Sequence, residues 1–127
     1  MSNENQVLKY TFEAGADLST KQFLFVVQAS DGQVDPVGTQ GIDATGVLAN
    51  KPDAAGRAAE VIVYGIAKVL AGGAINPGAK VMSDNTGKAI AATSTGFCLG
   101  VHTGTSAAAS GDIVPVLLRS GGHFALS

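Results

Sequence analysis

Hydrophobic positions in this chain fall in short runs, and each run is bounded by glycine, proline or polar residues. The clearest example is the stretch 60–84, in which β-branched and apolar positions alternate with turn-forming residues. This pattern predicts a strand, a turn, a strand, a loop and a further strand. The apolar positions are Val61, Val63, Ile66, Val69 and Val81, and the predicted breaks are Gly65, Gly72-Gly73 and Pro77-Gly78.

The rest of the chain shows the same pattern. An Asp31-Gly32 pair predicts a hairpin, and residues 85–87 predict a second tight turn. No segment has sustained helical periodicity, and residues 53–60 could supply a turn or two at most. We therefore expect an all-β fold, a small barrel or tulip-like arrangement of short strands with little helix. Further strands are predicted at 7–12, 23–27, 33–37, 46–48, 88–91, 97–102 and 113–118.

The run 23–27 is apolar at five consecutive positions. Such a run predicts a strand that is buried on both faces or covered by another subunit. A barrel of this size cannot hide that much apolar surface on one inner face, so Phe23 and Phe25 are candidates for a contact between copies of the chain.

Glycine spacing suggests an internal repeat. Gly32, Gly46 and Gly56 are echoed by Gly87, Gly100 and Gly111, at offsets of 55, 54 and 55 residues. Two copies of one meander could close a single pseudo-symmetric barrel. The alternative is coincidence among the 17 glycines of the chain.

Composition limits the class of protein. A chain of 127 residues fits one domain, and we expect an N-terminal arm at 1–10, a β-rich domain at 11–120 and a C-terminal tail at 121–127. A net charge of −2 offers no basic surface for direct nucleic-acid binding. No apolar run approaches the ~20 residues of a membrane-spanning helix, and the N-terminus lacks the pattern of a signal peptide, so we expect a protein made in the cytosol.

Reactive side chains are few. Cys98 lies between Phe97 and Leu99 and is expected to be a buried thiol, and His102 is expected at the surface or a sheet edge. Strand rise would separate Cys98 from His102 by about 13 Å, which is too far for a catalytic pair. The other histidine is His123. Asp31, Asp35 and Asp43 do not match a calcium-loop spacing. We expect no enzyme activity, no metal site and no cofactor.

Several segments together resemble the small capsid cement, or decoration, proteins of tailed bacteriophages. They are Gly15-Ala-Asp-Leu-Ser, Gly46-Val-Leu, Val61-Ile-Val-Tyr-Gly-Ile-Ala-Lys-Val, Ala74-Ile-Asn-Pro-Gly-Ala-Lys-Val, Thr86-Gly-Lys, Cys98-Leu-Gly-Val and Val114-Pro-Val-Leu-Leu. The resemblance implies a β-rich homotrimer on the capsid surface of the virion, assembled in the host cytoplasm, that bridges subunits of the major capsid protein. It implies no catalytic residues. The alternative is a small β-barrel binding module for a carbohydrate or a receptor, which would be expected to expose aromatic platforms.

The N-terminal segment is the candidate contact with the capsid. Residues 1–6 are polar, whereas the next six have strand character. Such a segment can add to an exposed sheet edge of a neighbouring protein. The alternative is a frayed terminus followed by an ordinary edge strand of the same domain. The candidate contact residues are Val7, Leu8, Tyr10 and Phe12.

Overall fold

All the regular structure in the described part of this protein is β-strand. The computed structural model describes residues 8–92 and 96–124, with side chains placed up to Leu118. Within these residues there is no helix, and hence none that could cross a membrane. The strands form one nine-stranded sheet in the order β1-β3-β2-β4-β5-β9-β8-β6-β7. They are β1 (Leu8–Ala14), β2 (Phe25–Gln28), β3 (Gln33–Pro36), β4 (Gly46–Leu48), β5 (Ala58–Leu70), β6 (Lys80–Ser83), β7 (Ala89–Ala91), β8 (Phe97–His102) and β9 (Ile113–Phe124).

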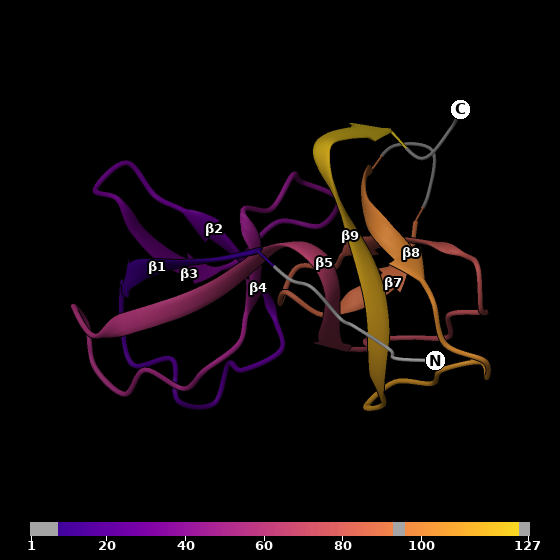
Figure 1. Ribbon diagram of the computed structural model, residues 1–127, viewed down its shortest axis with the longest axis horizontal. Helices are drawn as coiled ribbons and strands as arrows, with labels where there is room; N and C mark the ends of the chain where they lie inside the picture. The colour runs from indigo at the N-terminus through magenta and orange to yellow at the C-terminus, as the bar shows by residue number, and fades with distance from the viewer. Residues whose placement is uncertain (1–7, 93–95, 125–127) are drawn as a thin grey trace.

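The sheet closes on itself twice, which divides the molecule into two lobes (Figure 1). In the N-terminal lobe, β1 pairs with both β3 and β5, so the order β1-β3-β2-β4-β5 returns to its start. In the C-terminal lobe, β5 is followed by β9, β8, β6 and β7, and a parallel bridge between Ala71 and Ala89 links β7 back to the end of β5. The two lobes therefore have β5 in common.

Strand β5 runs without interruption through Gly65, where the sequence predicted a turn. It is 13 residues long, and its first half pairs with β1 and β4 while its second half pairs with β9. Gly65 has a φ of 102°, a conformation that residues with a side chain rarely adopt. The glycine lets the strand leave one lobe and enter the other without ending. The expected break at Gly65 was therefore wrong.

Strand register confirms the internal repeat. The pair Val26↔Pro36 of β2 and β3 recurs as Val81↔Ala91 of β6 and β7. The pair Val47↔Ile62 of β4 and β5 recurs as Val101↔Leu117 of β8 and β9. The two turns predicted from glycine are counterparts of each other, with a φ of 86° at Gly32 and 89° at Gly87. Each copy closes its own lobe, so the two copies do not share one barrel.

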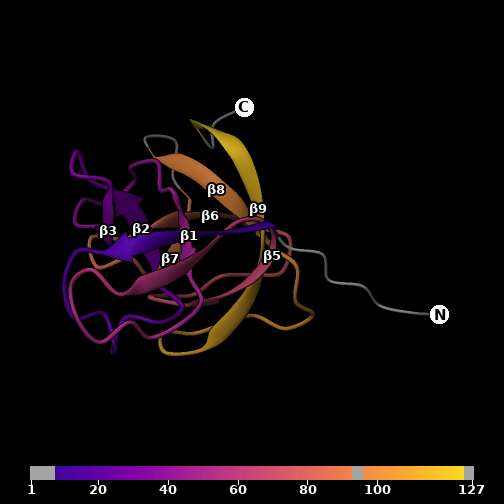
Figure 2. The ribbon, with the colours of Figure 1, turned by 60° about the vertical axis from the view of Figure 1, so that its left-hand side comes forward.

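The shared strand plays a different part in each copy. Phe12↔Ala59 pairs β1 with the first half of β5, and Val69↔Val114 makes the equivalent pair between the second half of β5 and β9. The first half of β5 therefore corresponds to β9, and its second half corresponds to β1. Figure 2 shows β1 lying alongside β5, as their pairing requires.

Each lobe has a small aliphatic core, because alternate side chains of every strand point inward. The run 23–27 is covered by the chain itself: Leu24 is 5% exposed, Phe25 1% and Val26 0%. Phe25 packs between the lobes, in a cluster that also contains Val81 and Leu99. The N-terminal core consists of Ala14, Leu18, Val26, Val34, Leu48, Ala59 and Val61, and its C-terminal counterparts are Ala71, Ile75, Val81, Ala89, His102, Val114 and Val116.

The ends of the chain differ from the expected domain limits. Residues 8–10, assigned to the N-terminal arm, belong to β1, and residues 121–124, assigned to the tail, continue the backbone of β9. Residues 1–7 and 125–127 lie outside the described part of the chain.

Candidate functional site: an apolar face over the shared strand

The exposed large hydrophobic side chains of the described residues all lie on three neighbouring strands. Leu8 and Tyr10 are on β1, Tyr64 and Ile66 on β5, and Ile113 on β9. Their exposed fractions range from 36% at Ile66 to 54% at Tyr10 and Tyr64. Because β5 pairs with both β1 and β9, the three strands are neighbours, and Leu8, Tyr64, Ile66 and Ile113 lie on their outer face. Tyr10 lies opposite the buried Val61, on the other face of β1.

On the C-terminal lobe this layer is apolar except for one exposed lysine, Lys68. Residues directly opposite each other in an antiparallel pair share one face, so Ile66 lies beside Leu117 and Leu70 beside Ile113. The third pair on this face is Lys68 with Pro115. We refer to Ile66, Leu70, Ile113, Pro115 and Leu117 together as the apolar face.

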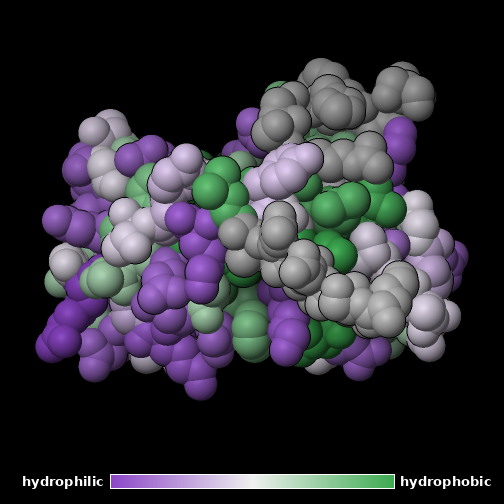
Figure 3. Space-filling view, viewed as in Figure 1, coloured by the Kyte–Doolittle hydropathy of each residue, from purple (hydrophilic) through white to green (hydrophobic). Residues whose placement is uncertain are grey.

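The equivalent layer of the N-terminal lobe is polar. There, Lys9 lies opposite Ile62, Thr11 opposite Glu60 and Glu13 opposite Ala58. The Lys9 Nζ and the Glu60 Oε1 form an ion pair at 3.5 Å. Figure 3 shows the contrast: hydrophobic side chains gather over β9, while the other half of the same view is mostly hydrophilic. Two copies of one unit have therefore diverged in the chemistry of the same face.

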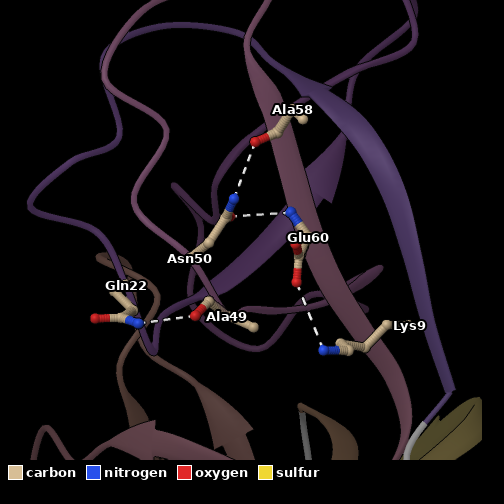
Figure 4. A network of polar contacts seen from close by, with 6 residues as sticks. All are labelled: Lys9, Gln22, Ala49, Asn50, Ala58 and Glu60. Atoms are coloured by element: carbon tan, nitrogen blue, oxygen red, sulfur yellow. Dashed lines mark hydrogen bonds and ion pairs between the residues drawn. The ribbon is translucent and has the colours of Figure 1, made fainter.

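A polar network secures the loop that borders the N-terminal layer (Figure 4). The Asn50 amide nitrogen donates to the Ala58 carbonyl at 3.0 Å, and its amide oxygen accepts from the Glu60 N–H at 2.9 Å. The Gln22 side chain donates to the Ala49 carbonyl at 2.7 Å. The two Asn50 bonds hold the loop after β4 against β5, and the Gln22 bond ties this loop to the segment before β2.

The C-terminal lobe secures the equivalent loop from inside its core. His102 is 2% exposed and takes the place that Leu48 has in the other lobe. Its Nδ1 accepts from the Gly104 N–H at 2.9 Å, so Nε2 carries the proton and donates to the Ser106 carbonyl at 3.1 Å. The expectation of a surface or edge histidine was wrong, because the loop's own backbone satisfies both ring nitrogens.

Phe23 is the one non-glycine residue with a positive φ, 72°, in the described part of the chain. Its N–H donates to the Leu48 carbonyl at 2.8 Å, and its carbonyl accepts from the Leu70 N–H at 2.9 Å. Its ring borders a hollow of about 210 Å³ together with Ile62 and Ile66. Two phenylalanines were predicted at a subunit contact. Phe23 has exposed surface beside the apolar face, whereas Phe25 is buried in the chain's own core.

The predicted capsid-contact residues are partly brought together. Leu8 lies opposite Tyr64, and Tyr10 opposite Val61, while Phe12 packs on the N-terminal core. Val7 lies outside the described residues. The backbone of β1 pairs with β5 over residues 8–13 but with β3 only at Glu13 and Ala14, so the first part of this strand has a paired neighbour of its own chain on one side.

A hollow of about 360 Å³ opens where the two lobes meet. It is lined by residues of both lobes, with Leu8 and Tyr64 on one side and Leu99 and Leu118 on the other. Its wall is mostly apolar, and Asp43 is the acidic residue among those lining it. No pattern in the sequence indicated this hollow, because it forms only when the two copies are packed together.

Among residues 8–92 and 96–124, few side chains are candidates for metal binding or for reactive chemistry. No group of three potential metal ligands occurs among them. Cys98 is 2% exposed, which confirms the predicted buried thiol. The pKa of Asp17 is lowered from its usual 3.8, because its carboxylate accepts a hydrogen bond from the Ser19 N–H at 3.0 Å in a fully exposed turn.

Two diverged copies of one β unit, with exposed apolar side chains gathered on one layer of strands, define a small all-β protein suited to surface contact. The chain belongs to the phage cement protein family, whose model matches residues 1–118. It therefore has a structural role at the phage capsid and is located in the virion. This family membership favours the structural role over the alternative of a carbohydrate- or receptor-binding module.

Among solved structures, the chain is similar to the N base of the head fiber protein gp8.5 of bacteriophage phi29. The TM-score is 0.65 at 19% identity, and the match covers 90% of this chain and 95% of that one. At this identity the similarity concerns the fold alone. No curated protein matches the chain.

Proposed function

We propose that this protein binds the outer surface of the expanded phage head as a homotrimer and bridges neighbouring subunits of the major capsid protein. The layer formed by β1, β5 and β9 lies against the shell. The observation that carries this proposal is that the exposed large hydrophobic side chains of the described residues all lie on these three strands.

The apolar face supplies most of the affinity. Burying apolar surface contributes about 25 cal/mol per Å², and a contiguous exposed patch is retained in evolution mainly where a partner covers it. The polar layer of the N-terminal lobe, with its ion pair between Lys9 and Glu60, provides the rim of the contact. Together they resemble the apolar centre and polar edge of a protein interface.

The hollow between the lobes adds a specific contact. Leu8 and Tyr64 border it, and both side chains are about half exposed. An apolar side chain of the major capsid protein fits such a hollow, because its wall is mostly apolar and residues of the proposed shell-facing strands line it. Leu8 thereby keeps the role predicted from the sequence, through its side chain.

Phe23 belongs to the same surface in this proposal. Its ring lies beside Ile62 and Ile66 rather than on the opposite side of the molecule. We therefore assign Phe23 to the capsid contact, although the sequence suggested a contact between copies.

The test is co-sedimentation of the purified chain with phage heads that lack it. We expect saturable binding to expanded heads and a higher temperature of DNA release from decorated heads. Failure to co-sediment with expanded heads, at concentrations that would saturate a site of micromolar affinity, would overturn the proposal.

A further inference from the structure

The hairpin contact between the two lobes is one-sided, although the loop at Gly41 of the N-terminal lobe also bonds to Ser83 and Phe97 of the C-terminal lobe. The turn between β6 and β7 of the C-terminal lobe lies on β2 of the N-terminal lobe, where the Phe25 N–H donates to the Gly87 carbonyl at 2.7 Å. A Cβ added to Gly87 would come within 2.9 Å of the Phe25 carbonyl oxygen and 3.2 Å of the Leu24 Cβ. The hairpin tip of the C-terminal lobe is thus seated on β2 of the N-terminal lobe.

The reciprocal contact is absent from the described part of the chain. Gly32 is the counterpart of Gly87, and the one atom near a Cβ added there is the side-chain nitrogen of Gln28, at 4.0 Å in the same lobe. The whole tip, residues 29–32, is exposed. A contact made by two different surfaces is heterologous, and a heterologous contact between like units can be repeated.

We propose that copies of this chain associate by repeating this internal contact. The β2–β3 hairpin tip of one copy, residues 29–32, sits on Ala79 and Lys80 of the next copy. These two residues are the counterparts of Leu24 and Phe25, because β6 repeats β2 in the same register.

Charge supports this pairing. The exposed tip of the β2–β3 hairpin has Asp31 at the position where the β6–β7 tip has Thr86. On the proposed receiving strand, β6, Lys80 stands at the position that Phe25 has in β2. Glu13 lies beside the free tip, since it pairs with Gln33. The tip therefore presents carboxylates to a strand that carries an ammonium group. A contact within one chain can bury Phe25, whereas a contact between separate chains favours complementary charges.

Repetition of a heterologous contact gives a closed ring or an open filament. Three copies closed in this way would place six similar lobes around one axis. The choice of three copies rests on the homotrimer of the proposed function. The contact itself depends neither on the trimer nor on the capsid.

Disulfide trapping tests the contact directly. The chain carrying both Gly32→Cys and Ala79→Cys should form disulfide-linked dimers and trimers on mild oxidation. The reason is that a Cβ at Gly87, the counterpart of Gly32, would lie 3.2 Å from the Cβ of Leu24, the counterpart of Ala79. The matched control carries Gly56→Cys with Ala79→Cys. Gly56 has a φ of 84° against 86° at Gly32, and both are in open space, so the backbone strain is the same. Equal cross-linking of the two variants would overturn the proposal.

A charge exchange provides a second test that needs no cysteine. We expect Asp31→Lys and Lys80→Glu each to weaken self-association about fivefold or more in sedimentation equilibrium, because each places like charges together. The double variant should recover most of the loss. A double variant as weak as the product of the single effects would contradict the pairing. Loss of self-association by Asp31→Lys with retained binding to heads would separate this contact from the proposed capsid function.

Discussion

Phe23 and Gly78 hold the same backbone conformation at equivalent points of the two lobes, with φ values of 72° and 81°. In both cases the N–H donates to the carbonyl of the neighbouring strand, Leu48 in one lobe and His102 in the other. Glycine adopts this conformation without strain, whereas phenylalanine does not. The strained residue is the one whose ring borders the proposed capsid contact.

The first prediction follows from this strain. We expect Phe23→Gly to be about 1 kcal/mol more stable than Phe23→Ala, because both remove the ring but only glycine relieves the backbone. Urea unfolding of the two variants measures the difference. Both variants should bind heads more weakly than the natural chain. Equal stability of the two variants would show that the backbone at position 23 is unstrained.

The second prediction concerns Gly46 and Gly100, the paired glycines of β4 and β8. A Cβ at Gly46 would meet the Ile62 carbonyl, and one at Gly100 the Leu117 carbonyl. We expect Gly46→Ala and Gly100→Ala to destabilise the fold by similar amounts, about 2 kcal/mol or more. Gly38→Ala is the control, since nothing lies within 4 Å of a Cβ there and its φ is not positive. Melting temperatures measure the loss. A lower melting temperature for only one of these two variants would contradict the structural equivalence of Gly46 and Gly100.

The third prediction uses the repeat as an internal control for the apolar face. Ile113 and Ala58 occupy equivalent exposed positions, opposite Leu70 and Glu13 respectively. We expect Ile113→Glu to weaken binding to heads at least about tenfold, because it removes buried apolar area and adds an unpaired carboxylate. Ala58→Glu should change binding by much less. Similar losses for both variants would argue against the assignment of the apolar face.

The fourth prediction concerns His102. Replacement by leucine, the residue at the equivalent core position, should leave the lobe folded but release the loop after β8, since two hydrogen bonds to Gly104 and Ser106 are lost. We expect amide hydrogen exchange at Gly104 to become at least about tenfold faster. Unchanged exchange at Gly104 would mean that the ring does not hold the loop.

Much of the fold could be predicted from glycine and β-branched residues. The strands at 46–48 and 97–102 have the predicted bounds, and the glycine spacing correctly indicated two copies of one unit. Turn-forming glycines leave a local signal, because the positive φ they permit is needed at one position regardless of the surroundings.

What the sequence could not show depends on packing between the copies. Gly65 was interpreted as a turn because a glycine that bends a continuous strand has the same local pattern as one that ends it. His102 was placed at the surface because its two partners belong to a loop whose backbone course no side-chain pattern reveals. The apolar face was missed because Ile66, Ile113 and Leu117 become neighbours only through the pairing of β5 with β9.

The most direct test of the account is a cryo-electron microscopy reconstruction of expanded heads with the protein bound. The account predicts density on the outside of the shell, with β1, β5 and β9 facing the major capsid protein and the apolar face covered. A map in which these strands face the solvent, or in which the protein lies inside the shell, would contradict it.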